Sequence, residues 1–307
     1  MIIERVAHLD RASASGAEGG GFESRLSHMK TLGYYNGEIA EIDKMRVPMN
    51  DRASYFGDGV YEAALAANGI IFTLNEHIDR LFRSASMLEI EVPFSKDELA
   101  KILSSLVKKV DGSMHFVYWQ LSRGTADRTH AFPENAKPNL WVTVKPWVMP
   151  DLGQKSKLIT VEDTRFFHCN IKTLNLIPNI MASEKAKKAG AKEAVFHRGE
   201  NVTECSHSNV HILNDGVLRT APADNLILAG ITRAHVLGCC EKLGIKTIEK
   251  SFTVSDMMAA DEVIVSSTSS FCTAANFIDG IPVGGKDPAL FKKIQDFLVN
   301  EFNQATA

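Results

Sequence analysis

The sequence predicts a mixed α/β protein with two domains. Its 307 residues are enough for two domains, and its 45% hydrophobic and 23% charged content is typical of a globular protein with a sizeable core. Strand-type and helix-type patterns alternate from Leu32 onward. Two prolines, Pro146 and Pro150, precede polar and glycine residues that are typical of a linker. We therefore predict a small N-terminal α/β domain over 31–148, a linker over 149–154 and a larger domain over 155–307.

The first 30 residues differ from the rest of the chain. Residues 13–21 are small and polar, and such a stretch cannot build a core. We expect residues 1–30 to be a disordered extension or a start-site artefact, with Met29 as the natural start. A transit peptide is the alternative, but the acidic residues in this stretch disfavour it.

The N-terminal domain is predicted to contain a strand that runs into an Asn-Gly turn, one tight hairpin and two helices. A strand within 34–39 meets an Asn-Gly turn at 36–37, and a second strand over 59–67 is followed by an Asn-Gly turn and residues 70–72. Asn75 is predicted to cap a helix over 76–90, and Ser95 a helix over 96–110. The first helix has a buried stripe made of Ile78, Leu81, Phe82, Ala85 and Leu88. Further strands are predicted over 114–122 and 139–145.

The C-terminal domain alternates in the same way. Strands are predicted near 157–162, 193–197, 208–213 and 261–266. Helices are predicted near 174–189, 231–243 and 287–303.

Charge, cysteine usage and hydropathy exclude several classes of protein. The formal net charge of −3 is unlike the basic excess of nucleic-acid-binding proteins. No apolar run reaches the length of a membrane span, and the N-terminus lacks the apolar segment of a secretory signal. The five cysteines show no metal-binding or disulfide spacing, and free thiols suit a cytoplasmic protein. No metal site is expected.

Lys172 is the most informative residue. It lies in the run 168–177, where no other residue carries a full charge at neutral pH. An apolar setting disfavours a charged ammonium, and a neutral lysine amine attacks carbonyls and forms Schiff bases. A solvated surface lysine is the alternative. The candidate residues that follow favour the reactive lysine, because they supply the other groups needed to bind pyridoxal 5'-phosphate (PLP).

The first of these groups is an acid for the pyridine nitrogen of PLP. Glu204 is the candidate, since it lies in a polar stretch, 202–209, that holds no other charged side chain at neutral pH. A carboxylate beside the pyridine nitrogen keeps that nitrogen protonated. Taken alone, Glu204 could equally be a turn residue.

The second group is a phosphate cradle. Gly230 precedes a helical pattern, and the exposed amides at a helix N-terminus bind phosphate. The Thr232 hydroxyl adds a donor, and the hydroxyl-rich run 266–270 at a strand end offers a second contact. Arg80, on the predicted helix 76–90, is the candidate for the balancing cation. A plain loop at 228–233 and a solvated Arg80 are the alternatives.

The third group binds a substrate carboxylate. Residues 123–130 form a polar loop just after a strand, in which Arg128 can pair bidentately with a carboxylate and His130 can add a donor. We expect Arg123 to form a structural ion pair and Asp58 to be a turn residue.

These motifs together resemble the fold-type IV PLP-dependent aminotransferases, most closely the bacterial D-amino-acid aminotransferases. The resemblance covers about residues 32–303. It is carried by short motifs at 56–62, 75–81, 123–125, 128–130, 171–175, 203–209 and 230–233, whose order and spacing are highly specific. It implies two α/β domains with PLP at their interface. It also implies a homodimer, because the Arg and His of the carboxylate trap come from the other subunit in that family.

The resemblance also assigns roles to individual residues. Lys172 is implied as the catalytic lysine that carries PLP. The implied cofactor-binding residues are Lys172, Arg80, Glu204, Ser208, Leu228, Ile231, Thr232, Ser267 and Thr268. The implied substrate-binding residues are Tyr61, Arg128 and His130. The implied reaction moves an amino group between a D-amino acid and a 2-oxo acid, with D-alanine and 2-oxoglutarate giving pyruvate and D-glutamate.

Two departures from the family pattern concern the substrate. Small residues are usual after the glutamate, whereas this chain has His207, which we expect to touch cofactor or substrate. Ala63 and Ala64 stand where bulkier residues are usual, which could widen the side-chain pocket. The alternatives are a branched-chain L-amino-acid transaminase, an R-amine transaminase, an aminodeoxychorismate lyase of the same fold and a non-enzymatic PLP-binding protein.

Overall fold

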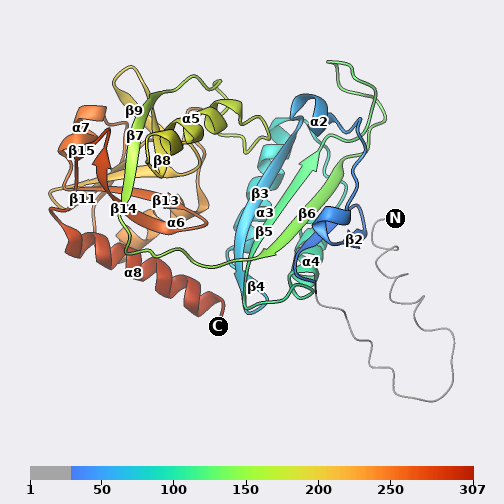
Figure 1. Cartoon of the computed structure of the whole chain (residues 1–307), viewed down its shortest axis with the longest axis horizontal. Coiled ribbons are helices and arrows are strands. Elements are labelled where there is room, and N and C mark those ends of the chain that lie inside the picture. The colour runs from blue at the N-terminus through green and yellow to red at the C-terminus, as the bar shows by residue number, and fades with distance from the viewer. Residues whose placement is uncertain (1–28) are drawn as a thin grey trace, which may run out of the picture. The chain divides into compact units, whose positions relative to one another are not determined.

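The computed structural model describes residues 29–307, which form two compact units (Figure 1). The first unit ends at Trp147 and the second begins at Val148. Residues 1–28 of the expected N-terminal extension lie outside the described residues.

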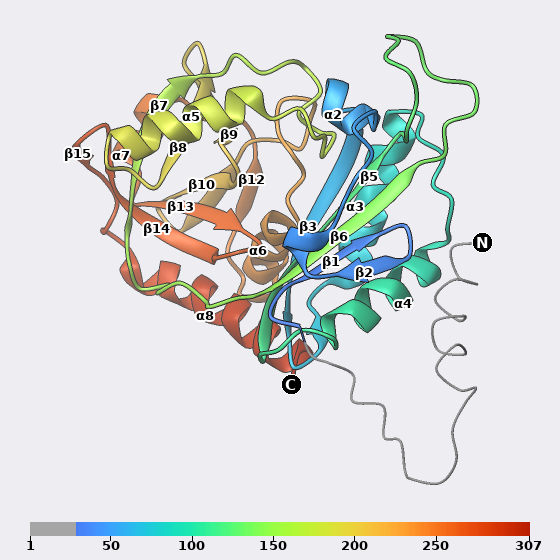
Figure 2. The same ribbon diagram turned by 45° about the vertical axis from the view of Figure 1, so that its right-hand side comes forward.

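The first unit is built on a six-stranded antiparallel sheet with the order β2-β1-β6-β5-β3-β4 (Figures 1 and 2). The strands are β1 (Leu32–Tyr35), β2 (Glu38–Ala40), β3 (Gly59–Ala67), β4 (Ile70–Ile71), β5 (Met114–Ser122) and β6 (Asn139–Pro146). The predicted hairpin of β3 and β4 is confirmed, and both Asn-Gly turns lie where they were predicted, at 36–37 and 68–69. The first turn also closes a hairpin, between β1 and β2. The long strands β3 and β5 pair along their whole length, from Gly59 opposite Ser122 to Ala67 opposite Met114.

Four helical segments accompany this sheet: η1 (Ile42–Lys44), α2 (Arg52–Phe56), α3 (Leu74–Met87) and α4 (Lys96–Val107). The prediction that Asn75 caps α3 is wrong. The helix begins one residue before Asn75, because Thr73 takes the left-handed conformation at the end of the hairpin and turns the chain into the helix. Ser95 caps α4 with a full capping box, as predicted. Both helices end about three residues earlier than predicted.

The apolar stripe of α3 is only partly buried as predicted. Ile78, Leu81 and Ala85 are buried, whereas Phe82 and Leu88 are half-buried. Three polar residues of the same helix are also buried: His77, Arg80 and Ser84. An acid of β3 binds His77 and Arg80 (below).

The second unit contains a mixed nine-stranded sheet with the order β12-β11-β10-β13-β14-β7-β8-β9, and β15 pairs with β14. The strands are β7 (Ser156–Glu162), β8 (Glu193–Arg198), β9 (Asn201–Cys205), β10 (Asn209–Asn214), β11 (Val217–Thr220), β12 (Thr247–Glu249), β13 (Glu262–Ser267), β14 (Phe271–Ile278) and β15 (Ile281–Pro282). The strand β7 runs parallel to both neighbours, β8 and β14. The four predicted strands are confirmed, and five further strands were not predicted.

The helices of the second unit are α5 (Ile177–Lys188), α6 (Ile231–Lys242), α7 (Val254–Ala259) and α8 (Pro288–Ala305). The helix predicted from residue 174 begins instead at Ile177. The Thr173 hydroxyl binds the backbone and side chain of Asn175 and keeps these residues in a turn. None of the helices over residues 29–307 is long and apolar enough to cross a membrane.

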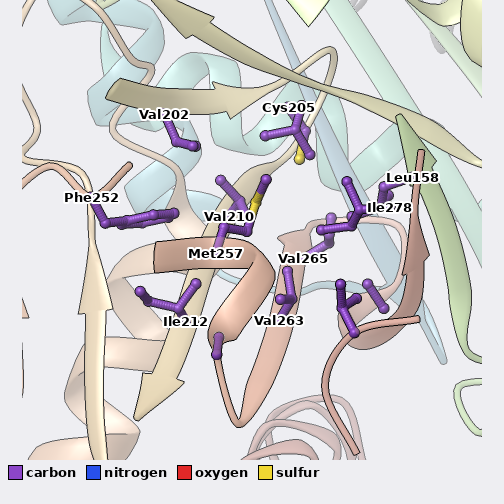
Figure 3. Close-up of a cluster of buried hydrophobic side chains, with 14 residues drawn as sticks. Leu158, Val202, Cys205, Val210, Ile212, Phe252, Met257, Val263, Val265 and Ile278 are labelled. Atoms are coloured by element: carbon purple, nitrogen blue, oxygen red, sulfur yellow. The ribbon is translucent and has the colours of Figure 1, made fainter. Parts of the chain in front are cut away.

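A buried cluster of side chains from β7, β8, β9, β10, β13, β14 and α7 forms a hydrophobic core in the second unit (Figure 3). Cys205, at the end of β9, points into this cluster beside Val210 (Figure 3). A smaller cluster joins α5 to β8 through Ala182, Ala186, Ala194 and Phe196. These two clusters fix the strand ends that carry the candidate site.

Candidate active site

Glu204 lies at the end of β9 and is 5% exposed. Its carboxylate accepts hydrogen bonds from Arg165 Nη1, from Asn209 Nδ2 at 3.1 Å and from the backbone N–H of Leu228 at 3.0 Å. Burial raises the pKa of Glu204 to about 7, although the Arg165 charge acts in the opposite direction. Glu204 is therefore a buried acid held in place from three sides.

Arg165 forms an ion pair with Glu204 and was not predicted from the sequence. Its guanidinium also binds Asp163 twice, from Nε to Oδ1 and from Nη2 to Oδ2, each at 2.9 Å. It donates to the Leu226 carbonyl at 3.1 Å and lies over the Phe196 ring. Burial opposes the ionisation of Asp163, but Arg165 and Arg198 outweigh it and lower the pKa of Asp163. The sequence signal that could have identified Arg165 is the pair of opposite charges, Asp163 and Arg165, directly after a strand.

Asn209 joins Glu204 to the loop that precedes α6. Its Nδ2 atom donates to Glu204 and to the Leu228 carbonyl, the latter at 2.9 Å. At the same place Gly230 passes so close that an added Cβ would lie 2.1 Å from Asn209 Oδ1. Only glycine allows this approach.

Apart from Arg80, the predicted phosphate residues lie around the same strand ends of the second unit. Gly230 is the N-cap of α6 and makes no side-chain cap hydrogen bond, so Ile231 and Thr232 form the open first turn of the helix. In the sheet, Asn209 lies opposite Ser266, the neighbour of Ser267 and Thr268. The Ser267 hydroxyl lies 2.9 Å from that of Ser270. The structure thus brings Glu204, the α6 N-terminus and the hydroxyl-rich turn together within one unit.

Lys172 lies on an irregular segment between β7 and α5 and is half-buried. Hydrogen bonds hold this segment against the loop before α6. The Cys169 N–H donates to the Asn225 carbonyl at 3.0 Å, and the Asn225 side chain donates to the Phe167 carbonyl at 3.3 Å. The segment of the candidate lysine is thereby held by the loop that Glu204 and Arg165 also bind.

A second buried acid, Glu193, holds the turn between β9 and β10. It is 1% exposed and accepts from the Ser208 hydroxyl at 2.9 Å and from the His207 N–H at 2.7 Å. The Nδ1 atom of His207 lies 3.1 Å from the same carboxylate. Glu193 was not predicted from the sequence. The Ser208 hydroxyl, predicted to bind cofactor, donates to this acid.

The remaining predicted residues belong to the first unit. Arg80 is 5% exposed and donates to Glu62 of β3 from Nε at 2.7 Å and from Nη2 at 2.9 Å. His77 Nδ1 lies 2.7 Å from the same carboxylate. Burial alone would raise the pKa of Glu62, but Arg80 and His77 outweigh it and lower that pKa to about 2. The cation that we predicted for phosphate is thus oriented by a buried ion pair, and its contact with phosphate stays a prediction.

Tyr61 and the loop with Arg128 and His130 also lie in the first unit. The Tyr61 ring stacks on Tyr118 with centroids 5.5 Å apart. Arg128 and His130 are exposed, and both lie against the ring of Phe56. The prediction that Arg123 forms a structural ion pair is confirmed, since its Nε atom lies 2.9 Å from Asp58 Oδ2. Asp58 was predicted only as a turn residue. In the structure its carboxylate also pairs with Arg52 and Arg123.

A metal site would need several His, Cys, Asp or Glu side chains close together. Over residues 29–307, no group of three or more His, Cys, Asp or Glu side chains is arranged to hold a metal ion. The acids described above are instead satisfied by arginine, asparagine, hydroxyl and backbone donors.

Known proteins are similar to this chain over most of its length. The family model of amino-transferase class IV matches residues 59–276. A D-alanine aminotransferase of Listeria monocytogenes is 42% identical over 283 residues, which cover 90% of this chain and 97% of that protein. A D-alanine aminotransferase of Bacillus licheniformis is 39% identical over 285 residues, or 91% and 99% of the two chains.

Solved structures show the same fold. A branched-chain aminotransferase from Thermoproteus uzoniensis has a TM-score of 0.80 at 24% identity, covering 89% of this chain and 95% of that one. A branched-chain amino acid aminotransferase from Escherichia coli has a TM-score of 0.80 at 23% identity, covering 88% and 94%. The resemblance noted in the sequence is confirmed: the chain belongs to amino-transferase class IV.

Proposed function

We propose that the protein is a PLP-dependent aminotransferase that moves an amino group between a D-amino acid and a 2-oxo acid. The preferred pair is D-alanine with 2-oxoglutarate, giving pyruvate and D-glutamate. The observation that carries the proposal is the buried Glu204 carboxylate, held by Arg165, Asn209 and Leu228 beside the uncapped N-terminus of α6. The D-alanine aminotransferases at 42% and 39% identity support the choice of substrate.

The residues present fit PLP. A buried acid suits the pyridine nitrogen, an uncapped helix N-terminus with Thr232 suits the phosphate, and the close packing of Gly230 on Asn209 brings these two subsites together. We assign Lys172, Glu204, Ser208, Leu228, Ile231, Thr232, Ser267, Thr268 and Arg80 to cofactor binding. When bound, PLP supplies an electron sink for the carbanion that forms when the substrate loses its Cα proton.

Each of the proposed site residues has a separate role. Lys172 would hold PLP through its side-chain amine, and the same amine would take the proton from the substrate Cα. Glu204 holds the charge of the pyridine nitrogen, and Arg165 keeps the Glu204 carboxylate oriented. Tyr61, Arg128 and His130 bind the substrate carboxylate. Because the carboxylate is held, only one enantiomer can present its Cα–H to Lys172, so the reaction selects one hand. The D-alanine aminotransferase relatives support the D form.

Alternative reactions of the same fold differ in the carboxylate trap or in the acceptor. A branched-chain L-amino-acid or R-amine transaminase would bind its substrate without the Arg-x-His loop at 128–130. An aminodeoxychorismate lyase would release pyruvate without an amino acceptor. A non-enzymatic PLP-binding protein would bind PLP and show no half-reaction.

We also infer a cytoplasmic homodimer. All five cysteines are free, which supports a reducing compartment. Large apolar side chains are exposed in the segment before Lys172 and on α5, namely Phe166, Phe167, Ile177, Ile180 and Met181. Exposed apolar side chains of this kind are typical of a subunit interface. A monomer in light scattering at micromolar concentration would contradict the dimer.

One half-reaction experiment tests the function. The PLP-loaded protein is mixed first with D-alanine and then, separately, with L-leucine, without an acceptor, and the visible absorbance of the lysine-bound cofactor is followed. We expect loss of the band with D-alanine only, formation of pyruvate, and return of the band with 2-oxoglutarate. Loss with L-leucine only would place the protein among the branched-chain enzymes. A band that stays unchanged with both would reject amino-acid transamination.

A further inference from the structure

We propose that Phe56 is a positioning residue for the substrate carboxylate, because its ring supports both Arg128 and His130. The inference rests on the proposed function, in which these two residues bind the carboxylate. Phe56 is not among the site residues predicted from the sequence. Its ring would explain how the exposed loop with Arg128 and His130 keeps a defined shape.

The ring of Phe56 contacts both side chains. The Arg128 guanidinium lies over it, with Cζ 5.1 Å from the ring centroid. The His130 ring is tilted against it, with centroids 5.5 Å apart. A π face attracts a guanidinium, and an aromatic neighbour restricts the rotation of an imidazole. The two exposed side chains therefore share one support.

The backbone between the two side chains is fixed independently. Thr129 separates Arg128 from His130, and its carbonyl accepts a hydrogen bond of 2.8 Å from Arg52 Nη1. Arg52 is only 2% exposed and its guanidinium also lies 4.9 Å from the centroid of the Phe56 ring. The loop is thus held at its middle residue while its flanking side chains rest on the ring.

The helix that carries Phe56 is itself anchored to the sheet. Asp51 caps α2 and accepts from Ser122 at the end of β5 and from Asn139 at the start of β6, at 3.0 Å and 2.8 Å. Arg52 Nε lies 2.7 Å from Asp58, just before β3. Three strand ends therefore fix α2, and the position of the Phe56 ring follows from the sheet.

A rigid support lowers the ordering cost of carboxylate binding. Removing the ring should release Arg128 and His130 without touching Lys172 or Glu204. We therefore expect weaker binding of carboxylates and nearly unchanged turnover at saturation. A loss of general folding would instead reduce cofactor content and turnover together.

The test compares Phe56→Leu and Phe56→Met with the wild type, all loaded with PLP. We expect KM for D-alanine and the inhibition constant of propionate, a carboxylate without an amino group, to rise roughly five- to thirtyfold. The turnover number should stay within about twofold. Phe56→Tyr keeps the ring and should restore values near those of the wild type.

Two controls make the result specific. Phe82→Leu removes a half-buried ring of α3, one that contacts Phe94 and Lys96, and should leave KM unchanged. In an Arg128→Leu background, Phe56→Leu should add less to KM than it does in the wild type, since the two residues act together. If KM and propionate inhibition are unchanged in Phe56→Leu and Phe56→Met, the inference is overturned. The proposed function still stands in that case, provided that the wild type turns over D-alanine. A wild type without D-alanine transamination would overturn both.

Discussion

The Asn209 side-chain amide donates a hydrogen bond of 3.1 Å to Glu204, and the same nitrogen lies 2.9 Å from the Leu228 carbonyl. One short side chain therefore links the buried acid to the loop that leads into α6. The link works because Gly230, the N-cap of α6, leaves room for the Asn209 oxygen.

Gly230→Ala should break this link. The new Cβ would lie 2.1 Å from Asn209 Oδ1, so the amide must move and lose its two hydrogen bonds. Losing them costs about 1–3 kcal/mol, and we expect a fall in PLP affinity of roughly tenfold to a hundredfold. Gly238→Ala in the same helix is the matched control, since no atom lies within 4 Å of its Cβ position. Equal PLP affinity in the two variants would reject the role of Gly230.

Glu204 predicts a pH-dependent stability of the cofactor-free protein. Burial raises its pKa from 4.5 to about 7, so the folded protein favours the protonated acid. The protonated Glu204 thus stabilises the folded state by about 3 kcal/mol. This stabilisation is fully present below about pH 4.5 and is lost as the pH rises through about 7. In urea unfolding, the stability of Glu204→Gln relative to the wild type should therefore increase by about this amount between roughly pH 4.5 and 8. A difference that does not change with pH would contradict the raised pKa.

Glu62 predicts the opposite pH dependence. Its pKa is lowered from 4.5 to about 2, because Arg80 and His77 outweigh the effect of burial. Glu62→Gln leaves the buried Arg80 charge uncompensated and should cost about 3–5 kcal/mol near neutral pH. The difference from the wild type should shrink as the pH falls from about 4.5 to 2, since Glu62 then becomes protonated. Glu91→Gln, an exposed acid of the same unit, should change stability by less than about 0.5 kcal/mol.

Local patterns predicted the elements whose signals lie within a few residues. The Asn-Gly turns, the N-cap at Ser95 and the glycine before α6 each appear in the structure as predicted. Partners distant in sequence were not predictable in this way. Arg165 meets Glu204 across 39 residues and Glu62 meets Arg80 across 18, because strand pairing and helix packing bring them together. Glu193 was missed for the same reason, since only the fold places it beneath the turn at 206–208.

Lys172→Ala should abolish both the visible absorbance of the lysine-bound cofactor and turnover. The lysine attaches the cofactor and also transfers the Cα proton, and proton transfer alone contributes about 10²–10⁴-fold to the rate. Absorbance spectroscopy of the PLP-loaded protein and a pyruvate assay measure the two effects separately. Lys185→Ala, an exposed lysine of α5, is the control and should retain both. Retained turnover in Lys172→Ala would remove Lys172 from the reaction.

Arg128→Leu tests the carboxylate trap. If Arg128 pairs with the substrate carboxylate, its loss removes a charged hydrogen bond of about 1.5–3 kcal/mol, and KM for D-alanine should rise roughly ten- to hundredfold. The preference for substrates that carry a carboxylate should weaken as well, because the remaining contacts of Tyr61 and His130 carry less charge. Arg83→Leu is the matched control, since Arg83 is an exposed arginine of α3 in the same unit. Steady-state kinetics with D-alanine and 2-oxoglutarate give both parameters. An unchanged KM would place Arg128 outside the site, and the support that Phe56 gives it would then serve the shape of the loop alone.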